Sequence, residues 1–244
     1  MRIELGSLAE LHATTRRDFL RLIGVGGALV LLPSFVTACA SDDVTGLPAS
    51  GGPFVIDFKA GDVAILQFAF VLEQIEADFY SRVVAAFAQS NFTTTEQALL
   101  TDIRNHEAIH RGFFEATLEA TPGASAALKV TPAYRGFAFT DRTGVLAFAK
   151  QIEALGIAMY NGVAQYVVSP ATLTLLAKVA AVEGRHASAI GDLITPRTDS
   201  FAPVATDDLF SPAKVATAAQ SNLVEKIGFL NLPEGFLQGP NGNG

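Results

Sequence analysis

The sequence predicts an all-α protein whose main domain is a four-helix bundle. Half of the 244 residues are hydrophobic and only 17% are charged, which suits a globular domain with a sizeable core. Apolar residues recur at three- and four-residue steps in four segments, the period of one helix face. Two of these segments carry a Glu-x-x-His motif, Glu107–His110 and Glu183–His186. The bundle is therefore expected to bury polar groups in its core.

The first two helices are predicted over residues 62–87 and 94–120. Asp62 is expected to be the N-cap of the first, since aspartate favours that position. Before the second helix, Thr93 and Glu96 have the spacing of a capping box, in which each side chain bonds the backbone of the other residue. Both helices are long enough to present several turns to the core.

A long connection is predicted between these helices and the next pair. Pro122-Gly123 ends the second helix, and residues 121–142 show no clear period. Long connections in compact domains usually serve a purpose, and a bundle of two antiparallel hairpins can require a crossover of this kind. Three aromatic residues are expected to pin the crossover to the helices: Tyr134, Phe137 and Phe139.

The third and fourth helices are predicted over residues 143–168 and 170–194. Ser169 followed by Pro170 is typical of an N-cap and the first helical position. Pro196 marks the end of the fourth helix, because proline cannot continue it. The bundle domain is thus predicted to span residues 62–194.

Residues 195–244 are predicted to form a C-terminal extension. Ser211-Pro212 again has the pattern of a helix start, which predicts a short helix reaching about Ile227. The Gly- and Asn-rich tail over 238–244 is expected to be disordered.

The N-terminal segment is expected to be a targeting signal and not part of the bundle. Residues 1–38 resemble a twin-arginine export signal: Arg16-Arg17 precede an apolar run over 22–35, which is too short to span a bilayer. Cys39, the only cysteine, ends a Val-Thr-Ala-Cys string that resembles a lipobox. An ordinary signal peptide with a chance cysteine is the alternative. Residues 39–61 are predicted to be a linker.

These signals predict an exported protein of the cell envelope or periplasm, anchored to the membrane through a lipid on Cys39. Removing residues 1–38 takes away four arginines and three acidic residues, so the net charge becomes −8. An acidic domain repels phosphate backbones, which argues against a nucleic-acid partner. The chain also has no Gly-rich phosphate loop after a strand pattern, so nucleotide binding is not indicated.

Six residues have the types and order of ligands for a pair of metal ions. Residues three apart share a helix face, so each Glu-x-x-His directs a carboxylate and an imidazole to one place. A lone inward glutamate precedes each motif. Burying this many carboxylates is costly unless cations lie among them. The predicted ligands of two iron or manganese ions are Glu73, Glu107, His110, Glu153, Glu183 and His186.

Neighbouring residues leave alternatives open. Glu76 is an alternative to Glu73, because Gln-Ile-Glu-Ala occurs at both 74–77 and 151–154. The tyrosine spacing favours Glu73, since Tyr80 and Tyr160 each lie seven residues after the lone glutamate of their half. Both tyrosines are expected near the metal ligands, where a hydroxyl could hydrogen-bond a carboxylate.

Four strings carry a resemblance to the ferritin-like superfamily, which includes ferritins, rubrerythrins and manganese catalases. They are Leu72–Tyr80, Asn105–His110, Glu153–Tyr160 and Glu183–His186. More narrowly, the chain resembles exported ferritin-like domain proteins that include desiccation-related proteins. The resemblance implies a left-handed four-helix bundle, a long crossover between helices 2 and 3, and a dimetal centre at mid-height.

The resemblance also implies a reaction class. We expect a dimetal oxidoreductase that oxidises ferrous iron or consumes peroxide, with oxygen or peroxide as the small-molecule substrate. The alternative is a non-enzymatic stress or desiccation protein, or an accessory subunit of a membrane complex, built on the same bundle. A metal-free scaffold held by salt bridges is a third hypothesis. A homo-oligomer or a membrane-complex partner is compatible with each.

Overall fold

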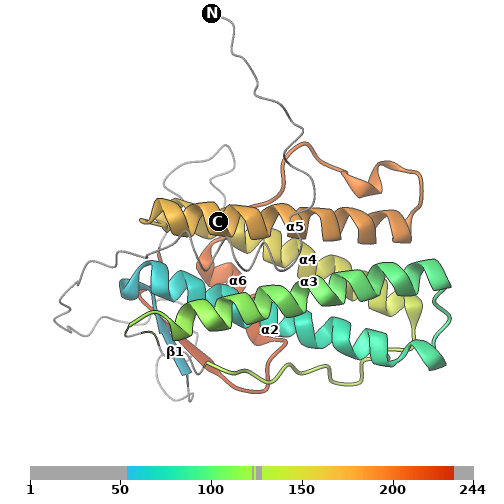
Figure 1. Cartoon of the computed structure of the whole chain (residues 1–244), viewed down its shortest axis with the longest axis horizontal. Helices are drawn as coiled ribbons and strands as arrows, with labels where there is room; N and C mark the ends of the chain where they lie inside the picture. The colour runs from blue at the N-terminus through green and yellow to red at the C-terminus, as the bar shows by residue number, and fades with distance from the viewer. Residues whose placement is uncertain (1–53, 123, 125–127, 234–244) are drawn as a thin grey trace, which may run out of the picture. The chain divides into compact units, whose positions relative to one another are not determined.

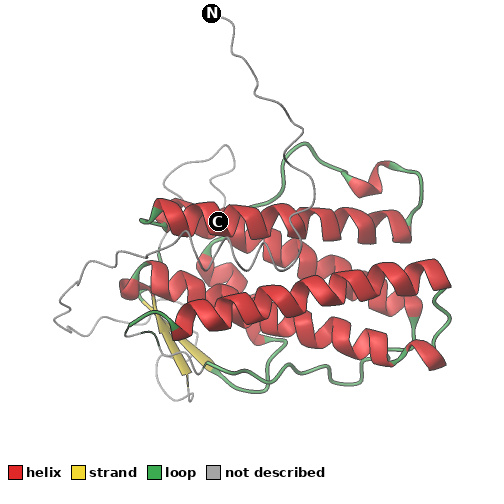
Figure 2. Cartoon of the chain, in the orientation of Figure 1, coloured by secondary structure: helices red, strands yellow, loops and turns green. Residues whose placement is uncertain are grey.

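The computed structural model describes residues 54–122, 124 and 128–233, and the other segments are grey in Figure 2. The predicted export signal, Cys39, the first part of the linker and the tail over 238–244 lie outside the described residues. No helix within the described ranges is both long enough and apolar enough to cross a membrane.

Four long helices form the bundle. They are α2 (Asp62–Ala85), α3 (Thr94–Glu119), α4 (Arg142–Val163) and α5 (Pro170–Ile194). Helix α2 packs mainly on α3, α4 packs mainly on α5, and α2 also contacts α4 (Figure 1). The predicted all-α bundle is confirmed, with the crossover between α3 and α4.

The predicted start signals of α3 and α5 are confirmed. The Thr93 hydroxyl accepts a hydrogen bond from the Glu96 N–H, and a Glu96 carboxylate oxygen accepts one from the Thr93 N–H at 2.8 Å. At α5, the Ser169 side chain accepts from the Thr172 N–H, and Pro170 is the first helical residue. These caps satisfy backbone donors that have no partner within the helix.

Asp62 has a different role from the one predicted. Gly61 is the N-cap of α2. The Asp62 carboxylate instead accepts hydrogen bonds from the N–H groups of Val168, at 2.8 Å, and Ser169, at 3.0 Å. It therefore ties the start of α2 to the link between α4 and α5. The sequence could not show this, because the partners lie more than a hundred residues away.

Two helices end earlier than predicted. Helix α2 stops at Ala85 and gives way to a short 3-10 segment, η3 (Phe87–Gln89). Helix α4 stops at Val163 and continues as η4 (Ala164–Tyr166). Tightening of the last turn to 3-10 geometry is common at helix ends. The spacing of apolar residues does not predict where this change occurs.

A two-stranded parallel pair was not predicted. β1 (Phe54–Asp57) pairs with β2 (Ile227–Leu230), so that Phe54 lies opposite Ile227. The segment from 54 to 61, assigned to the linker, thus forms β1 and η2 (Phe58–Ala60). Helix α6 runs over Pro212–Gln220, so the prediction that it reaches Ile227 was wrong. Strands of four residues are too short for a period to reveal them.

The C-terminal segment lies against the bundle at two glycines. A Cβ on Gly162 would lie 1.9 Å from the carbonyl oxygen of Phe210. A Cβ on Gly191 would lie 2.2 Å from the carbonyl oxygen of Ser200, a residue of the 3-10 segment η5 (Asp199–Phe201). The absence of side chains at these positions lets the segment approach α4 and α5 closely. The Phe210 N–H donates to the Ala158 carbonyl at 3.0 Å.

The crossover is held against α2 by an aromatic cluster, as predicted. The fully buried Phe79 ring lies 4.8–6.0 Å, centroid to centroid, from four other rings: Tyr134, Phe137, Phe139 and Phe148. The Tyr134 hydroxyl donates to the Ile75 carbonyl at 2.9 Å. Aromatic pairs in this separation range attract one another beyond the area that they bury.

Removing the central ring of this cluster is expected to destabilise the protein strongly. Phe79→Ala should lower the free energy of unfolding by about 3–5 kcal/mol, because it leaves a cavity that four neighbouring rings cannot all fill. Denaturant titration followed by circular dichroism measures this. Exposed Phe201, changed to Ala, is the matched control and should cost much less. Equal losses for both variants would contradict the role of the cluster.

Candidate metal centre

The six predicted ligand residues all lie in the core of the bundle, and each of the four helices supplies at least one. Glu73 comes from α2 and Glu153 from α4, while α3 and α5 each supply a Glu-x-x-His pair. The four glutamates have no exposed surface, and the two histidines are 4–5% exposed. The three-residue spacing places each histidine one turn beyond its glutamate on the same face.

His110 stands at the centre of the first cluster. Its Nδ1 atom lies 2.8 Å from Glu183 Oε1, 3.3 Å from Glu107 Oε2 and 3.4 Å from Glu73 Oε2. These three carboxylates come from three different helices. One ligand atom from each of the four residues lies within 4.8 Å of the others, a spread that one ion can bring together.

His186 stands at the centre of the second cluster. Its Nδ1 atom lies 2.7 Å from Glu107 Oε1, 3.5 Å from Glu183 Oε2 and 3.6 Å from Glu153 Oε2. The four ligand atoms again lie within 4.8 Å of one another. The two clusters thus have the same composition of three carboxylates and one imidazole.

Glu107 and Glu183 belong to both clusters. Each presents one carboxylate oxygen toward His110 and the other toward His186. Glu73 belongs only to the His110 cluster and Glu153 only to the His186 cluster. The geometry therefore distinguishes two shared carboxylates from two terminal ones, an assignment that the sequence left open.

Several atoms of the clusters have no hydrogen bond although they are fully buried. They are Glu73 Oε2, Glu107 Oε1, Glu153 Oε2, both oxygens of Glu183 and Nδ1 of His186. His186 Nδ1 and Glu107 Oε1, for example, lie 2.7 Å apart but without the angles of a hydrogen bond. An unsatisfied buried charge is costly. A set of converging carboxylate oxygens and imidazole nitrogens is a ligand set that suits iron or manganese.

Burial and mutual proximity shift the pKa values of the ionisable groups in the site. Burial alone lowers the pKa of His186, but the surrounding carboxylates outweigh this effect and raise the pKa to about 12. His110 is raised well above its ordinary pKa for the same reason, Glu73 contributing most. Burial raises the pKa of Glu73 to about 8, against the opposing effect of His110. Without a metal ion, the imidazoles of His110 and His186 are therefore both protonated near neutral pH.

Tyr80 and Tyr160 hydrogen-bond ligand carboxylates, and they do so crosswise. The Tyr80 hydroxyl on α2 donates to Glu153 Oε1 on α4, and the Tyr160 hydroxyl on α4 donates to Glu73 Oε1 on α2. Burial and the adjacent carboxylate raise the pKa of both phenols well above the usual value. Each terminal carboxylate is thus left with one oxygen, Oε2, directed to its cluster.

The crosswise bonds predict that each tyrosine acts on the cluster of the other half. Tyr160→Phe should weaken the ion beside His110 by roughly 10- to 100-fold, because Glu73 loses the donor that orients it. Metal titration followed by calorimetry measures the loss. Tyr134→Phe is the control, since its hydroxyl bonds the Ile75 backbone and not a ligand carboxylate. An unchanged affinity in Tyr160→Phe would contradict this role.

Glu76, the alternative to Glu73, lies in neither cluster of the described residues. Three residues after Glu153, the position that corresponds to Glu76 is Gly156. A Cβ there would lie 3.0 Å from Glu76 Oε1, so the Glu76 carboxylate occupies space that a side chain at 156 would fill. Burial and then the charges of Glu183 and Glu73 raise the pKa of Glu76 well above its usual value. The two halves are therefore unequal here.

His106 is a neighbour of the site that the sequence did not identify as functional. Its Nδ1 atom lies 3.0 Å from His186 Nε2, in a side-chain hydrogen bond. His106 directly precedes Glu107 and is turned about 100° from it on the helix, so helix geometry alone points it away from the ligand face. Its contact is with α5 across the bundle, and no local pattern signals such a contact.

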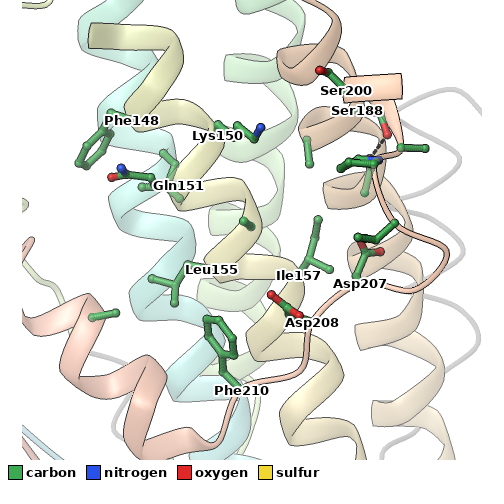
Figure 3. A pocket seen from close by; sticks show the side chains of 18 of the residues that line it. Phe148, Lys150, Gln151, Leu155, Ile157, Ser188, Ser200, Asp207, Asp208 and Phe210 are labelled. Carbon is green, nitrogen blue, oxygen red and sulfur yellow. Dashed lines mark hydrogen bonds between the residues drawn. The ribbon is translucent and has the colours of Figure 1, made fainter. Parts of the chain in front are cut away.

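A hollow of about 800 Å³ lies outside the clusters (Figure 3). Side chains of α4, including Phe148, Lys150 and Leu155, line one side, and Asp207, Asp208 and Phe210 of the C-terminal segment line another. None of the six candidate ligands is among its described lining residues. The hollow therefore belongs to the packing of the C-terminal segment and not to the metal centre.

A comparison with protein families matches residues 61–196 to the ferritin-like domain, more than half of the chain. The chain belongs to the ferritin-like domain family. The match begins at Gly61 and extends past the end of α5, so it includes the four long helices but neither strand. All six candidate ligands lie inside it. A search among curated proteins found no match. The buried carboxylate and histidine clusters of this ferritin-like domain fit a metal site.

Proposed function

We propose that this ferritin-like domain holds two iron or manganese ions and uses them to oxidise ferrous iron or to consume peroxide. The observation that carries the proposal is the sharing of Glu107 and Glu183 between two clusters that are otherwise separate. Two divalent ions balance the charges of the four clustered carboxylates. A bound pair of such ions supplies redox chemistry toward oxygen or peroxide.

The protein residues would bind, orient and shield. The two histidines and the two terminal glutamates would each serve one ion, while the shared carboxylates would fix the spacing between the ions. Tyr80 and Tyr160 hold the outer oxygens of Glu153 and Glu73, which keeps the inner oxygens directed to the centre. The surrounding apolar core excludes water, which strengthens the electrostatic interactions within the site.

Reconstitution of the full chain tests both parts of the proposal. The purified protein is stripped with a chelator and loaded anaerobically with Fe²⁺ or Mn²⁺. Elemental analysis should then find about two ions per chain, and the loaded protein should consume oxygen or peroxide. The double variant His110→Ala, His186→Ala is the comparison and should do neither. Binding of less than one ion per folded chain would contradict the metal centre.

If the metal-loaded protein consumes oxygen or peroxide no faster than the His110→Ala, His186→Ala variant, the redox function is contradicted although the metal centre is not. That outcome would favour the alternative, a non-enzymatic stress or desiccation protein, or an accessory subunit of a membrane complex. Turnover with only one of the two metals would identify the resident ion. Metal content and turnover are measured on the same sample, so the two failures are distinguishable.

We also infer that the domain is exported and held at the membrane by a lipid on Cys39. The support is the sequence alone: Arg16-Arg17, the apolar run over 22–35 and the cysteine follow one another in the order that such signals require. Cys39→Ser should move the protein from the membrane fraction to the soluble fraction of the expressing cell. Equal membrane association of both forms would contradict lipid attachment.

A further inference from the structure

His106 contacts the candidate centre from outside the two clusters. His186 directs Nδ1 to the carboxylates, so its other nitrogen, Nε2, faces away from them, and His106 Nδ1 meets it at 3.0 Å. The two ring planes differ by only 13°. A ring N–H lies in the plane of its ring, so this hydrogen bond places the two imidazoles edge to edge and not face to face.

A metal ion on Nδ1 of His186 would decide which nitrogen of that ring carries the proton. The ion would require the lone pair of Nδ1, so the proton of the neutral ring would reside on Nε2. There it would donate to the Nδ1 lone pair of His106, 3.0 Å away. A second residue that accepts the outer N–H of a ligand histidine fixes its tautomer and ring orientation and increases its basicity.

The other half of the bundle lacks this arrangement. His106 directly precedes the Glu-x-x-His motif of α3, and the corresponding residue before the motif of α5 is Val182. Valine has no hydrogen-bonding side-chain atom, so it cannot support His110 as His106 supports His186. The two clusters share their composition but differ in this contact.

We propose that His106 is a positioning residue for His186 and that it makes the two metal positions unequal, the ion beside His186 being held more tightly. This inference rests on the proposed function, because it requires that the clusters bind metal. It goes beyond that function in assigning a role to a residue outside the six ligands and an order of filling to the two positions.

The test is titration of the metal-free full chain with Co²⁺, whose visible spectrum reports ligand geometry without the oxidation that accompanies iron. The wild-type protein should bind two ions in two resolved steps. His106→Ala should weaken the tighter step by roughly 10- to 100-fold, the usual effect of losing such a partner. The weaker step should be unchanged, and the spectrum of the first ion should shift.

Two further variants separate positioning from packing. Val182→Ala alters the corresponding site of the other half and should change neither step. His106→Gln retains an amide oxygen that can accept the Nε2 proton of His186, so it should restore most of the affinity lost in His106→Ala. Circular dichroism melts of all variants confirm that the bundle is intact.

Three results would overturn the inference. They are unchanged binding in His106→Ala, equal weakening of both steps, and a loss in Val182→Ala as large as that in His106→Ala. Failure of the wild-type protein to bind any Co²⁺ would overturn the proposed metal centre together with this inference. Binding by the wild type with no response to His106→Ala would overturn the positioning role alone.

Discussion

Replacing both shared carboxylates is expected to abolish binding of both metal ions. In the double variant Glu107→Gln, Glu183→Gln, each position loses two of its three carboxylates and keeps one glutamate and one histidine. An amide oxygen carries no full charge and is a far poorer ligand for a divalent ion. Elemental analysis after reconstitution should fall from about two ions per chain to none.

The single variants make the assignment sharper. Glu107→Gln should weaken both ions, because its two oxygens face different clusters. Glu73→Gln should weaken only the ion beside His110, since Glu73 belongs to that cluster alone. Exposed Glu119, changed to Gln on the same helix as Glu107, is the control and should leave both ions bound. Retention of two ions by the double variant would refute the shared positions.

Metal affinity is expected to rise steeply with pH. In the metal-free protein, attraction to the surrounding carboxylates raises the pKa of His186 to about 12 and that of His110 well above its usual value. Both imidazoles are therefore protonated near neutrality, and each ion must displace one proton from Nδ1. The dissociation constant of each ion should consequently fall at least about tenfold per pH unit, or at least about 100-fold between pH 6 and 8.

Both ions should show a steeper dependence than their histidine alone would give. Burial raises the pKa of Glu73 to about 8 and that of Glu153 well above its usual value, so near neutrality each ion also displaces a proton from the terminal carboxyl group of its cluster. The slope should therefore exceed one proton per ion at pH 6, and for the ion beside His110 it should approach one above pH 8. Calorimetric titrations in buffers of different ionisation enthalpy count the released protons directly. Dissociation constants that do not change from pH 6 to 8 would contradict the protonated resting state.

The tyrosines show how far sequence spacing can be followed. The seven-residue separation from Glu73 to Tyr80 and from Glu153 to Tyr160 placed both hydroxyls near the candidate ligands, and they are there. Spacing along one helix could not show that each hydroxyl bonds the carboxylate of the other helix. That pairing depends on how α2 and α4 face each other, which is a property of the packed bundle.

Glu73 and Glu76 show the same limit. The tyrosine spacing and the repeated Gln-Ile-Glu-Ala string favoured different residues, and both carboxylates proved to be buried. Only the position of His110 on α3 distinguishes them, because Glu73 reaches its Nδ1 atom and Glu76 lies against Gly156 instead. Two glutamates one turn apart on one helix face are equivalent until the opposite helices are placed.

The sequence by itself determined the features that are local in the chain. The four helices follow from apolar residues at helical period, two of their starts follow from the Thr93 and Ser169 caps, and the candidate ligands follow from repeated three-residue spacing. Only the tertiary structure decided which carboxylates two clusters share, where Asp62 bonds, how β1 meets β2, and that His106 meets His186. The physical reason is range: periodicity and capping act within a few residues, whereas these contacts join residues that are far apart in the chain and meet only when the helices pack.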